Sequence, residues 1–288
     1  MVSHYIRRNN AIHRQSFSVV HNKAPHFLNL WQHHQELELV LILQGKGIRF
    51  IGDSIEPFVP GDFILLGEDL PHKWQNNPEY FQDKGLTAEA IVIHFEKTFL
   101  SGALEHTVEL KTIKDLIDSS QRGIIFKGYS KALAPAKLQE ILKVSPGPHG
   151  LVQLLDLLRI LAAEKEVEFI TKSGYKVSHL SKDAKLLKVN SYIMNNFQQP
   201  ITLDDVAQEV NMNKSSFCRY FRSTTQKGFS HYLNEIRIGY ACKLLQVSKQ
   251  RKIAEVCFES GFNNLSNFND KFKQHTGYTP SDYAQLFA

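Results

Sequence analysis

The sequence lacks the features that would mark a secreted or membrane protein. It has three cysteines, none in a Cys-x-x-Cys pair, and this low, odd count argues against a disulfide framework. It has no run of 18 consecutive apolar residues, so no membrane-spanning helix is predicted. The first residues lack the apolar core of a secretory signal. We therefore expect a cytoplasmic protein with no membrane partner.

Several catalytic fingerprints are also missing. The sequence contains no phosphate-binding loop, no glycine-rich dinucleotide motif and no Gly-x-Ser-x-Gly nucleophile elbow. What it does contain is an ordinary globular composition, with 42% hydrophobic and 22% charged residues in 288 positions. That length predicts about two domains, each large enough to bury a core of its own.

Basic charge is concentrated in one part of the chain. Residues 181–288 hold 14 Lys and Arg against 9 Asp and Glu, whereas the first 180 residues hold 20 of each. The whole net charge of +5 therefore belongs to the last 108 residues. A basic domain beside a neutral one indicates an anionic partner, with nucleic acid as the first candidate.

The pattern of apolar and turn residues divides the rest of the chain. Residues 1–100 hold short β-rich runs separated by Gly, Pro and Asn turns, which is typical of an all-β sandwich or barrel. The expected strands are 17–20, 27–30, 37–43, 48–51, 63–66 and 90–95. Residues 101–170 predict helices at 109–120, 133–144 and 151–163. An exposed linker is expected at 171–184.

The helix predicted at 151–163 is rich in leucine beyond a single stripe. Such a helix is either fully buried in its own domain or shared between its domain and a second subunit. Both interpretations remain open, and the second predicts a homodimer.

Residues 185–288 contain one helical unit twice. Residues 203–212 match 253–262 at an offset of 50, and 221–232 match 272–283 at an offset of 51. Each copy has a small residue followed four positions later by a turn residue that tolerates positive φ, which is Asn211 in one copy and Gly261 in the other. Two helices joined in this way form a helix-turn-helix, whose second helix enters the major groove of DNA.

The two units, 203–222 and 253–273, therefore predict a DNA-binding domain. The candidate DNA contacts are the polar residues of the two second helices: Lys214, Ser215, Cys218, Arg219, Arg222, Asn264, Ser266, Asn269, Asp270 and Lys273. Arg219 suits guanine, Asn269 suits adenine and Asp270 suits cytosine. Arg222 is better placed for a phosphate. For each residue the alternative is an ordinary solvated helix face.

One further helix is predicted between the two units, at 229–247. It is long enough to hold two reading helices close to one turn of DNA apart, roughly 34 Å. One chain could then occupy two adjacent major grooves of double-stranded DNA.

These residues resemble the AraC/XylS family of bacterial transcription regulators. The matching stretches include Leu203-x2-Val206-Ala207, Phe217-x3-Phe221-Arg222, Gly261-Phe262-Asn263 and Gly277-Tyr278-Thr279-Pro280. The sequence departs from the family pattern at Asn211 and Gln226, where glycine is usual, at Cys257, where alanine is usual, and at Ala284, where arginine is usual. The resemblance implies a dimeric regulator, more often an activator than a repressor, with a small-molecule effector and RNA polymerase as further partners.

The front domain resembles a cupin barrel. Gln32, His34 and Glu38 share one parity, so in a strand they lie on one face. The stretches His34-x3-Glu38-x6-Gly45, Pro60-Gly61-Asp62 and Pro71-His72-x3-Asn76 match the two short cupin motifs. In metal-binding cupins three histidines and one glutamate hold a divalent ion. His34, Glu38 and His72 match three of those positions, and Gln32 occupies the fourth.

Two interpretations of this cluster remain open, a metal site and a metal-free barrel that binds a small effector. We expect no metal and no cofactor, because the fourth ligand is missing. The candidate effector-binding residues are Trp31, His34, Glu38, Arg49, His72, Trp74 and His94. Tryptophan together with histidine and glutamate suits a sugar or another polar metabolite.

The sequence thus predicts an α+β multidomain protein. Residues 1–100 are expected to form a cupin-like double-stranded β-barrel that senses a ligand, and 101–170 a helical dimerisation segment. Residues 185–288 are expected to form an all-α domain with two helix-turn-helix units. The predicted function is sequence-specific, effector-responsive transcription regulation without enzymatic activity. The alternative is a metal-dependent cupin enzyme with a helical appendage.

Overall fold

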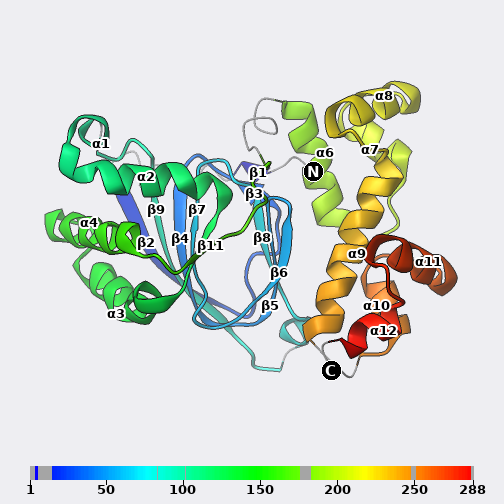
Figure 1. Cartoon of the computed structure of the whole chain (residues 1–288), viewed down its shortest axis with the longest axis horizontal. Coiled ribbons are helices and arrows are strands. Elements are labelled where there is room, and N and C mark those ends of the chain that lie inside the picture. The colour runs from blue at the N-terminus through cyan, green and yellow to red at the C-terminus, as the bar shows by residue number, and fades with distance from the viewer. Residues whose placement is uncertain are drawn as a thin grey trace. The chain divides into compact units, whose positions relative to one another are not determined.

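The computed structural model describes residues 15–82, 84–100, 102–175, 183–247 and 251–286, together with the backbone of residues 4–5. The chain forms two compact units, His4–Val177 and Ser178–Ala288 (Figure 1). The boundary falls in the segment predicted as a linker, of which residues 176–182 lie outside the described residues. The first unit is rich in β-sheet and the second is helical, which confirms the α+β class. No helix in these described ranges is long and apolar enough to cross a bilayer.

Two β-sheets face each other in the first unit. The larger has the order β11-β10-β7-β4-β9-β2, which are Val167–Phe169, Ile124–Phe126, Phe63–Leu66, Leu37–Gln44, Ala88–Phe95 and Phe17–Ala24. The smaller has the order β1-β3-β8-β5-β6, which are His4–Tyr5, Gln32–His33, His72–Asn76, Gly47–Ile51 and Ser54–Phe58. Neighbouring strands are antiparallel except β1 and β3.

Strand β4 shows how the larger sheet buries both of its faces. Because side chains alternate along a strand, Leu39 and Leu41 point to one face, and Val40 and Ile42 to the other. All four are buried. Val40 and Ile42 belong to a core that also contains Trp74 of the smaller sheet, so this core lies between the two sheets. A strand buried on both faces is a continuous apolar run, which is why β4 was predicted within one residue of its observed ends.

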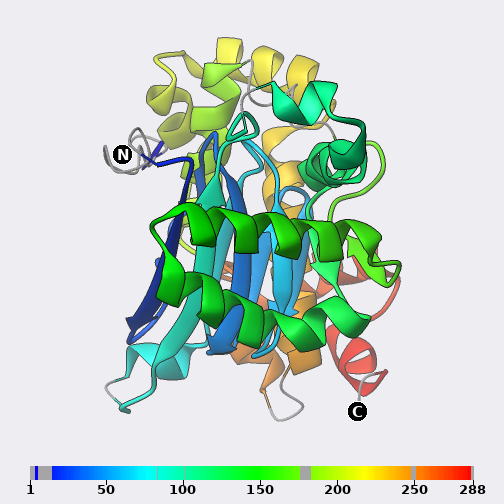
Figure 2. The same cartoon turned by 90° about the vertical axis from the view of Figure 1, so that its left-hand side faces the viewer.

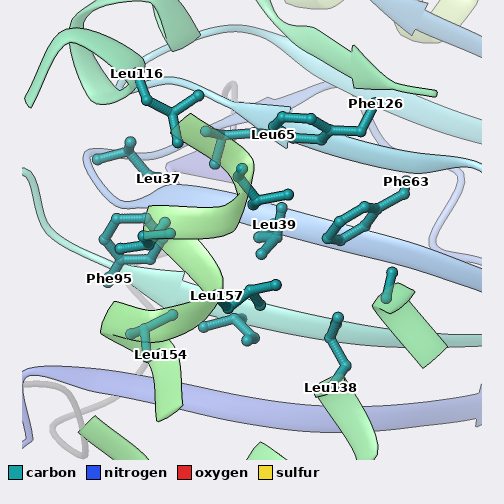
Figure 3. Close-up of a cluster of buried hydrophobic side chains, with 14 of the residues drawn as sticks. Leu37, Leu39, Phe63, Leu65, Phe95, Leu116, Phe126, Leu138, Leu154 and Leu157 are labelled. Carbon is teal, nitrogen blue, oxygen red and sulfur yellow. The ribbon is translucent and has the colours of Figure 1, made fainter. Parts of the chain in front are cut away.

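Helices α3 (Gly128–Val144) and α4 (Pro148–Ala163) lie across the other face of the larger sheet (Figure 2), and α2 (Lys111–Ser119) contributes to the same core. Leu154 and Leu157 of α4 lie in one core with Leu39 and Phe95 of the sheet (Figure 3). A short helix, α1 (Ala103–His106), and the 3₁₀ segments η2 (Pro78–Phe81), η3 (Val108–Leu110) and η4 (Ser120–Arg122) complete the unit. The helices expected at 109–120, 133–144 and 151–163 are thus present. Helices α3 and α4 end at the predicted residues but begin five and three residues earlier, and α2 is shorter than predicted at both ends.

The structure corrects the predicted strands at several places. Residues 27–30 are not a strand, because the Phe27 amide donates to the Asn76 side chain instead of a sheet neighbour. Strands β6 and β8 were not predicted. The segment 101–170 is not wholly helical, since β10 and β11 extend the larger sheet by pairing with each other and with β7.

The second unit contains only helices in its described residues. They are α6 (Ala184–Asn196), α7 (Leu203–Glu209), α8 (Lys214–Thr225), α9 (Phe229–Val247), α10 (Ile253–Glu259), α11 (Leu265–Thr276) and α12 (Pro280–Gln285). The pairs α7–α8 and α10–α11 are the two predicted helix-turn-helix units. Helix α9 joins them and packs against α8, α10, α11 and α12. Its ends are those predicted from the sequence.

The two helix-turn-helix copies have the same turn between their helices. Asn211 and Gly261 both have positive φ, 53° and 86°. Between α7 and α8 the Met212 amide donates to the Ala207 carbonyl at 2.9 Å, and between α10 and α11 the Phe262 amide donates to the Cys257 carbonyl at 3.1 Å. The repeated sequence therefore folds into a repeated backbone.

The second helices also end alike, and here a departure from the family pattern matters. Gln226 follows α8 with φ of 59°, and Gly277 follows α11 with φ of 82°. Both are left-handed helix caps, where glycine is favoured because it has no Cβ. Gln226 therefore adopts the glycine-like geometry at an energetic cost.

We predict that Gln226→Gly stabilises the DNA-binding unit by up to about 1 kcal/mol, the usual cost of a left-handed residue with a side chain. The gain is reduced by the loss of the hydrogen bond from Gln226 Nε2 to the Ser223 carbonyl. Urea unfolding of the full chain, followed by circular dichroism of the helical transition, measures the change. Gly277→Ala is the matched control and should destabilise, because its added Cβ meets strain without any steric neighbour. Equal stability of both variants with the native chain would contradict this account.

Candidate DNA-binding surface and buried polar cluster

The predicted DNA-contacting residues lie on the exposed faces of α8 and α11. In α8 the buried positions are Phe217 and Phe221, spaced four residues apart, so the opposite face is free for polar residues. In α11 Phe268 and Phe272 occupy the equivalent positions. All ten predicted contacts are exposed: Lys214, Ser215, Cys218, Arg219, Arg222, Asn264, Ser266, Asn269, Asp270 and Lys273.

Side-chain caps fix where each of these helices begins. Asn213 Oδ1 accepts from the Ser216 amide at the start of α8, and Asn264 Oδ1 accepts from the Asn267 amide at the start of α11, both at 2.9 Å. These caps satisfy amides that the helix itself leaves unpaired. Asn264 was predicted to contact DNA, but its oxygen already serves as a cap, which leaves only its amino group for a base or phosphate.

The charges on this surface are mostly uncompensated. Lys214 forms an ion pair with Asp204 at 3.0 Å, and both side chains are exposed. Such an exposed pair contributes little and is easily exchanged for a phosphate contact. No ion pair within the described residues is recorded for Arg219, Arg222 or Lys273, so their charges are available to an anionic partner.

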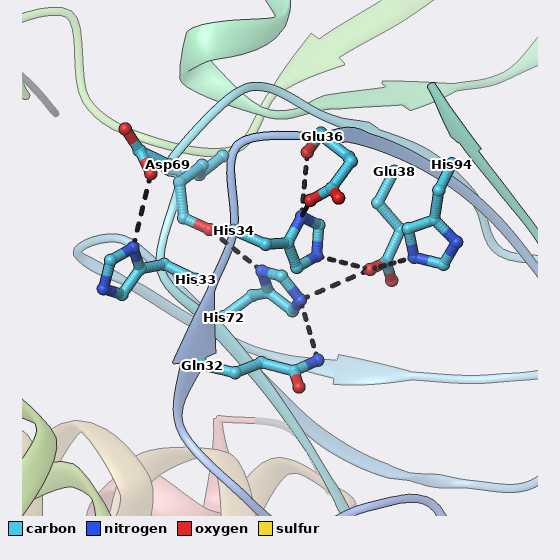
Figure 4. Close-up of polar contacts among 9 residues, drawn as sticks. Gln32, His33, His34, Glu36, Glu38, Asp69, His72 and His94 are labelled. Atoms are coloured by element: carbon cyan, nitrogen blue, oxygen red, sulfur yellow. Dashed lines mark hydrogen bonds and ion pairs between the residues drawn. The ribbon is translucent and has the colours of Figure 1, made fainter. Parts of the chain in front are cut away.

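The second feature is a buried polar cluster in the first unit (Figure 4). At its centre is the Glu38 carboxylate from β4. Glu38 Oε2 lies 2.9 Å from His34 Nε2, 3.0 Å from His94 Nε2 and 3.6 Å from His72 Nε2. Gln32 Nε2 lies 3.1 Å from His72 Nε2. All five side chains are buried.

Several strands bring these residues together. Gln32 lies on β3 and His72 on β8, which pair in the smaller sheet. Glu38 and His94 are directly paired across β4 and β9 of the larger sheet. The sequence predicted that Gln32, His34 and Glu38 share the face of one strand, but the chain bends between β3 and β4. The bend preserves the convergence of their side chains, whereas His33 points elsewhere and lies 3.4 Å from Asp69.

Hydrogen bonding identifies the protonation of His34. Its Nδ1 donates to the Glu36 carbonyl at 2.9 Å, and its Nε2 donates to the Glu38 carboxylate. Both partners are acceptors, so these contacts favour the doubly protonated ring. Burial by itself lowers the pKa of His34, but the hydrogen bond and charge of Glu38 outweigh it and the pKa is raised. Burial likewise works to raise the pKa of Glu38, but the surrounding histidines hold it well below its ordinary value.

The donor set of this cluster fits a divalent metal ion. Ligand atoms of His34, Glu38 and His72 all lie within 4.8 Å of one another. Two imidazole nitrogens and a carboxylate oxygen are typical ligands of zinc and of other first-row divalent ions. His94 donates to the same carboxylate, as outer-shell partners of metal sites do.

Arg49 and Trp74 belong to the same interior but make other contacts. They are paired across β5 and β8, so their side chains share the face that looks toward the larger sheet. The Arg49 guanidinium donates to the Pro57 carbonyl at 2.8 Å and to Asp62 at 3.1 Å. Its Nε is buried with no hydrogen-bond partner. Trp74 packs edge-on against Phe58 at 5.4 Å.

Two contributors to the site were missed by sequence reasoning. Asp62 pairs with Arg49, and the Glu36 carbonyl orients His34. The Pro-Gly-Asp turn that holds Asp62 was visible in the sequence, but its direction toward β5 was not. Trp31, the remaining predicted effector residue, is buried next to the start of β3.

The chain is similar to known regulators over different parts of its length. Residues 206–285 match the family described as a helix-turn-helix domain. The melibiose operon regulatory protein of Escherichia coli (strain K12) is 21% identical over 279 residues, covering 92% of this chain and 86% of that protein. The HTH-type transcriptional activator RhaR of Yersinia pestis bv. Antiqua (strain Angola) is 24% identical over 277 residues, covering 93% and 89%.

A solved structure is similar to part of the chain. It is a transcriptional regulator of the AraC-type DNA-binding-domain proteins from Chromobacterium violaceum, 25% identical, with a TM-score of 0.35, covering 38% of this chain and 96% of that one. The curated relatives are transcription regulators and not enzymes. The prediction that this chain is not an enzyme is confirmed, and the cupin-enzyme alternative is not supported.

Proposed function

We propose that the chain is a transcription regulator with a DNA-binding domain of the AraC type, and that it is an effector-responsive activator that reads two adjacent major grooves. The observation that carries the proposal is the duplicated helix-turn-helix, with ten exposed polar residues on its two second helices. Helix α9 has 19 residues and is therefore about 28 Å long. That length approaches the spacing of successive major grooves, roughly 34 Å.

Within this surface the side chains divide by the kind of contact they suit. Arg219 lies in the middle of α8, where its guanidinium can donate two hydrogen bonds to guanine. Arg222 and Lys273 lie in the last turn of their helices, which favours phosphate contacts that position the protein. Asn269 and Asp270 are the base-reading candidates of α11.

The first unit is the proposed effector sensor. Its interior between the sheets combines an apolar core with Arg49, whose Nε has no partner, and with Trp74. An aromatic side chain and a guanidinium suit the apolar face and the hydroxyl groups of a sugar. One relative is named for the melibiose operon, and melibiose is a sugar. We therefore place the effector among sugars or similar polar metabolites.

The helical part of the first unit is the proposed dimer contact. Helix α4 buries Leu154, Leu157, Leu158 and Leu161 against its own sheet. On its outer side Val152 is 60% exposed, next to the half-buried Leu151 and Leu155. A homodimer built on this apolar edge would bring two DNA-binding units to one operator. RNA polymerase is the proposed further partner of an activator, and the cytoplasm, where bacterial DNA lies, is the proposed location.

DNA binding is tested with a duplex selected from a random-sequence library. We expect the logarithm of affinity to fall steeply with the logarithm of salt concentration, because phosphate neutralisation releases counterions. Arg219→Ala should cost about 1–3 kcal/mol and relax the preference at one base pair. Arg222→Ala should weaken all sequences alike and make the salt slope shallower by about 1. Lys188→Ala, an exposed change on α6, is the control and should alter neither quantity. A flat salt slope would refute DNA binding through this surface.

The dimer contact is tested by sedimentation equilibrium of the full chain. Val152→Asp should weaken self-association at least about tenfold, because a carboxylate buried in an apolar contact costs more than 1.4 kcal/mol. Val108→Asp, at a residue that is 83% exposed outside α4, should leave self-association unchanged. A native chain that is monomeric at high micromolar concentration would rule out the contact.

The effector is tested by thermal shift with melibiose and simple hexoses. A sugar at 100 times its Kd should stabilise the first unit by about 2.7 kcal/mol and raise its Tm. Arg49→Lys should abolish most of this shift, since lysine cannot offer the unpartnered Nε donor. Arg159→Lys, at an exposed position of α4, should keep it. If no sugar shifts the Tm while another class of polar metabolite does, the sugar assignment is wrong.

A further inference from the structure

A hydrogen bond joins the reading helix α8 to the start of α6. The Tyr220 hydroxyl donates to Asp183 Oδ2 at 2.7 Å, and the bond is partly buried. Tyr220 directly follows Arg219 in the sequence and is half-buried, so it lies between the exposed face of α8 and the apolar one. A side chain at the edge of the DNA-reading face thus contacts the residue from which α6 begins.

Asp183 uses both of its carboxylate oxygens. Its Oδ1 caps α6 by accepting from the amides of Lys185 and Leu186 at 3.0 and 3.2 Å, which leaves Oδ2 for Tyr220. Burial works to raise the pKa of Asp183, but the Tyr220 hydroxyl and the two amides outweigh it and the pKa is lowered. A hydroxyl that donates to a charged carboxylate makes a strong, directional contact. Serine or asparagine could also cap the helix, but neither offers a second oxygen to Tyr220.

This contact adds direction to the apolar packing of α8. Phe217 and Phe221 are buried, and both rings pack against Phe229 at the start of α9, with centroids 6.2 and 6.1 Å away. Apolar packing determines which face of a helix is buried but is not directional. A short hydrogen bond to a fixed acceptor restrains the finer rotation of the helix about its axis. That rotation determines where the neighbouring Arg219 side chain points.

The other copy of the helix-turn-helix has a different residue at this position. At the offset of 51, the residue that matches Tyr220 is Lys271. The Lys271 ammonium donates to Gln274 of the same helix at 3.0 Å. The repeat as such therefore does not account for the bond between Tyr220 and Asp183, which belongs to the copy that directly follows α6 along the chain.

We propose that Tyr220 and Asp183 are positioning residues that set the angle at which Arg219 meets its base pair. The proposal rests on the proposed DNA-binding function and extends it to two residues outside the reading face. Because Asp183 also caps α6, the start of that helix and the reading helix α8 are joined at one carboxylate. A displacement of the chain at Asp183 therefore changes recognition by α8 more than recognition by α11.

The test is a set of double-mutant cycles on the affinity of the full chain for the selected duplex. Asp183→Ser keeps a helix cap but removes the oxygen that Tyr220 contacts. In that background Arg219→Ala should cost at least about threefold less affinity than in the native chain, because Arg219 is already misaligned. The cost of Asn269→Ala, on α11, should stay within the roughly twofold scatter of independent sites. Tyr220→Phe should give both results, and combining it with Asp183→Ser should add nothing further.

Tyr232→Phe is the matched control. The Tyr232 hydroxyl also donates to α6, to Asn190 Oδ1 at 3.2 Å, but it projects from α9. This variant loses a hydroxyl contact with α6 and should leave the cost of Arg219→Ala at its native value. A tyrosine that only supports the fold would behave in the same way. The proposal is therefore overturned if the cost of Arg219→Ala is also native in Tyr220→Phe.

Hydrogen exchange of the free chain separates this result from a failure of the regulator function. Asp183→Ser and Tyr220→Phe should both speed amide exchange in α8 and leave exchange in α11 at the native rate. A native chain that binds no duplex would refute the proposed function, and the exchange rates would still decide whether Asp183 holds α8. Native exchange rates in α8 of both variants would overturn the positioning role.

Discussion

The side chain of Arg237 sets the relation between the two helix-turn-helix units. It projects from the middle of α9, and its Nε donates to the Phe197 carbonyl at 2.7 Å while its Nη2 donates to the Gln199 carbonyl at 2.9 Å. These carbonyls belong to the segment just after α6, which precedes the first helix-turn-helix. The same guanidinium lies over the ring of Phe262, directly after the turn of the second helix-turn-helix. The Arg237 guanidinium on α9 therefore contacts both the segment that precedes the first helix-turn-helix and the turn of the second. The proposed reading of two grooves requires a fixed spacing between α8 and α11, which contacts of this kind favour.

This contact also explains why the two copies of the turn differ in sequence. A Cβ added at Gly261 would lie 2.3 Å from the Phe197 carbonyl oxygen and 2.9 Å from Arg237 Nε. Glycine is therefore required there by close packing as well as by its positive φ. Asn211 has the same left-handed backbone but is exposed, and asparagine tolerates that conformation well. Asparagine in place of the usual glycine therefore occurs at the copy whose turn residue is exposed.

The sequence predicted the DNA-binding unit better than the sheets, and the reason is periodicity. Each helix of the repeat carries its own apolar spacing and cap, so local rules place 229–247 without knowledge of the rest. The strands β6 and β8 depend on partners instead. β6 contains Pro57, which demotes a run to an edge strand, and β6 lies at the edge of its sheet. β8 contains Lys73, Gln75 and Asn76 and has no apolar alternation for a pattern to detect. Its identity as a strand comes from pairing with β5.

The polar cluster was predictable only in part, and again from a local sequence pattern. Parity along the chain grouped Gln32, His34 and Glu38, although the strand assumed for them is broken by a bend. His94 was proposed from its residue type, and its pairing with Glu38 follows from the register of β4 and β9, which no local rule supplies. The carbonyls that orient His34 and His72 could not be read from side-chain identity at all.

The position of Glu38 gives the cluster a mechanical consequence within the first unit. Its carboxylate contacts His94 in the larger sheet and His72 in the smaller one, so a single charge connects both sheets. Elsewhere the sheets meet through apolar side chains such as Val40 and Trp74, which pack closely but carry no directional preference. The Glu38 carboxylate thus forms a directional contact between the two sheets. Strand β4, which carries Glu38, also contributes Leu37, Leu39 and Leu41 to the apolar core on which α2, α3 and α4 pack, so the charged contact and the helical face proposed for dimer contact share one strand.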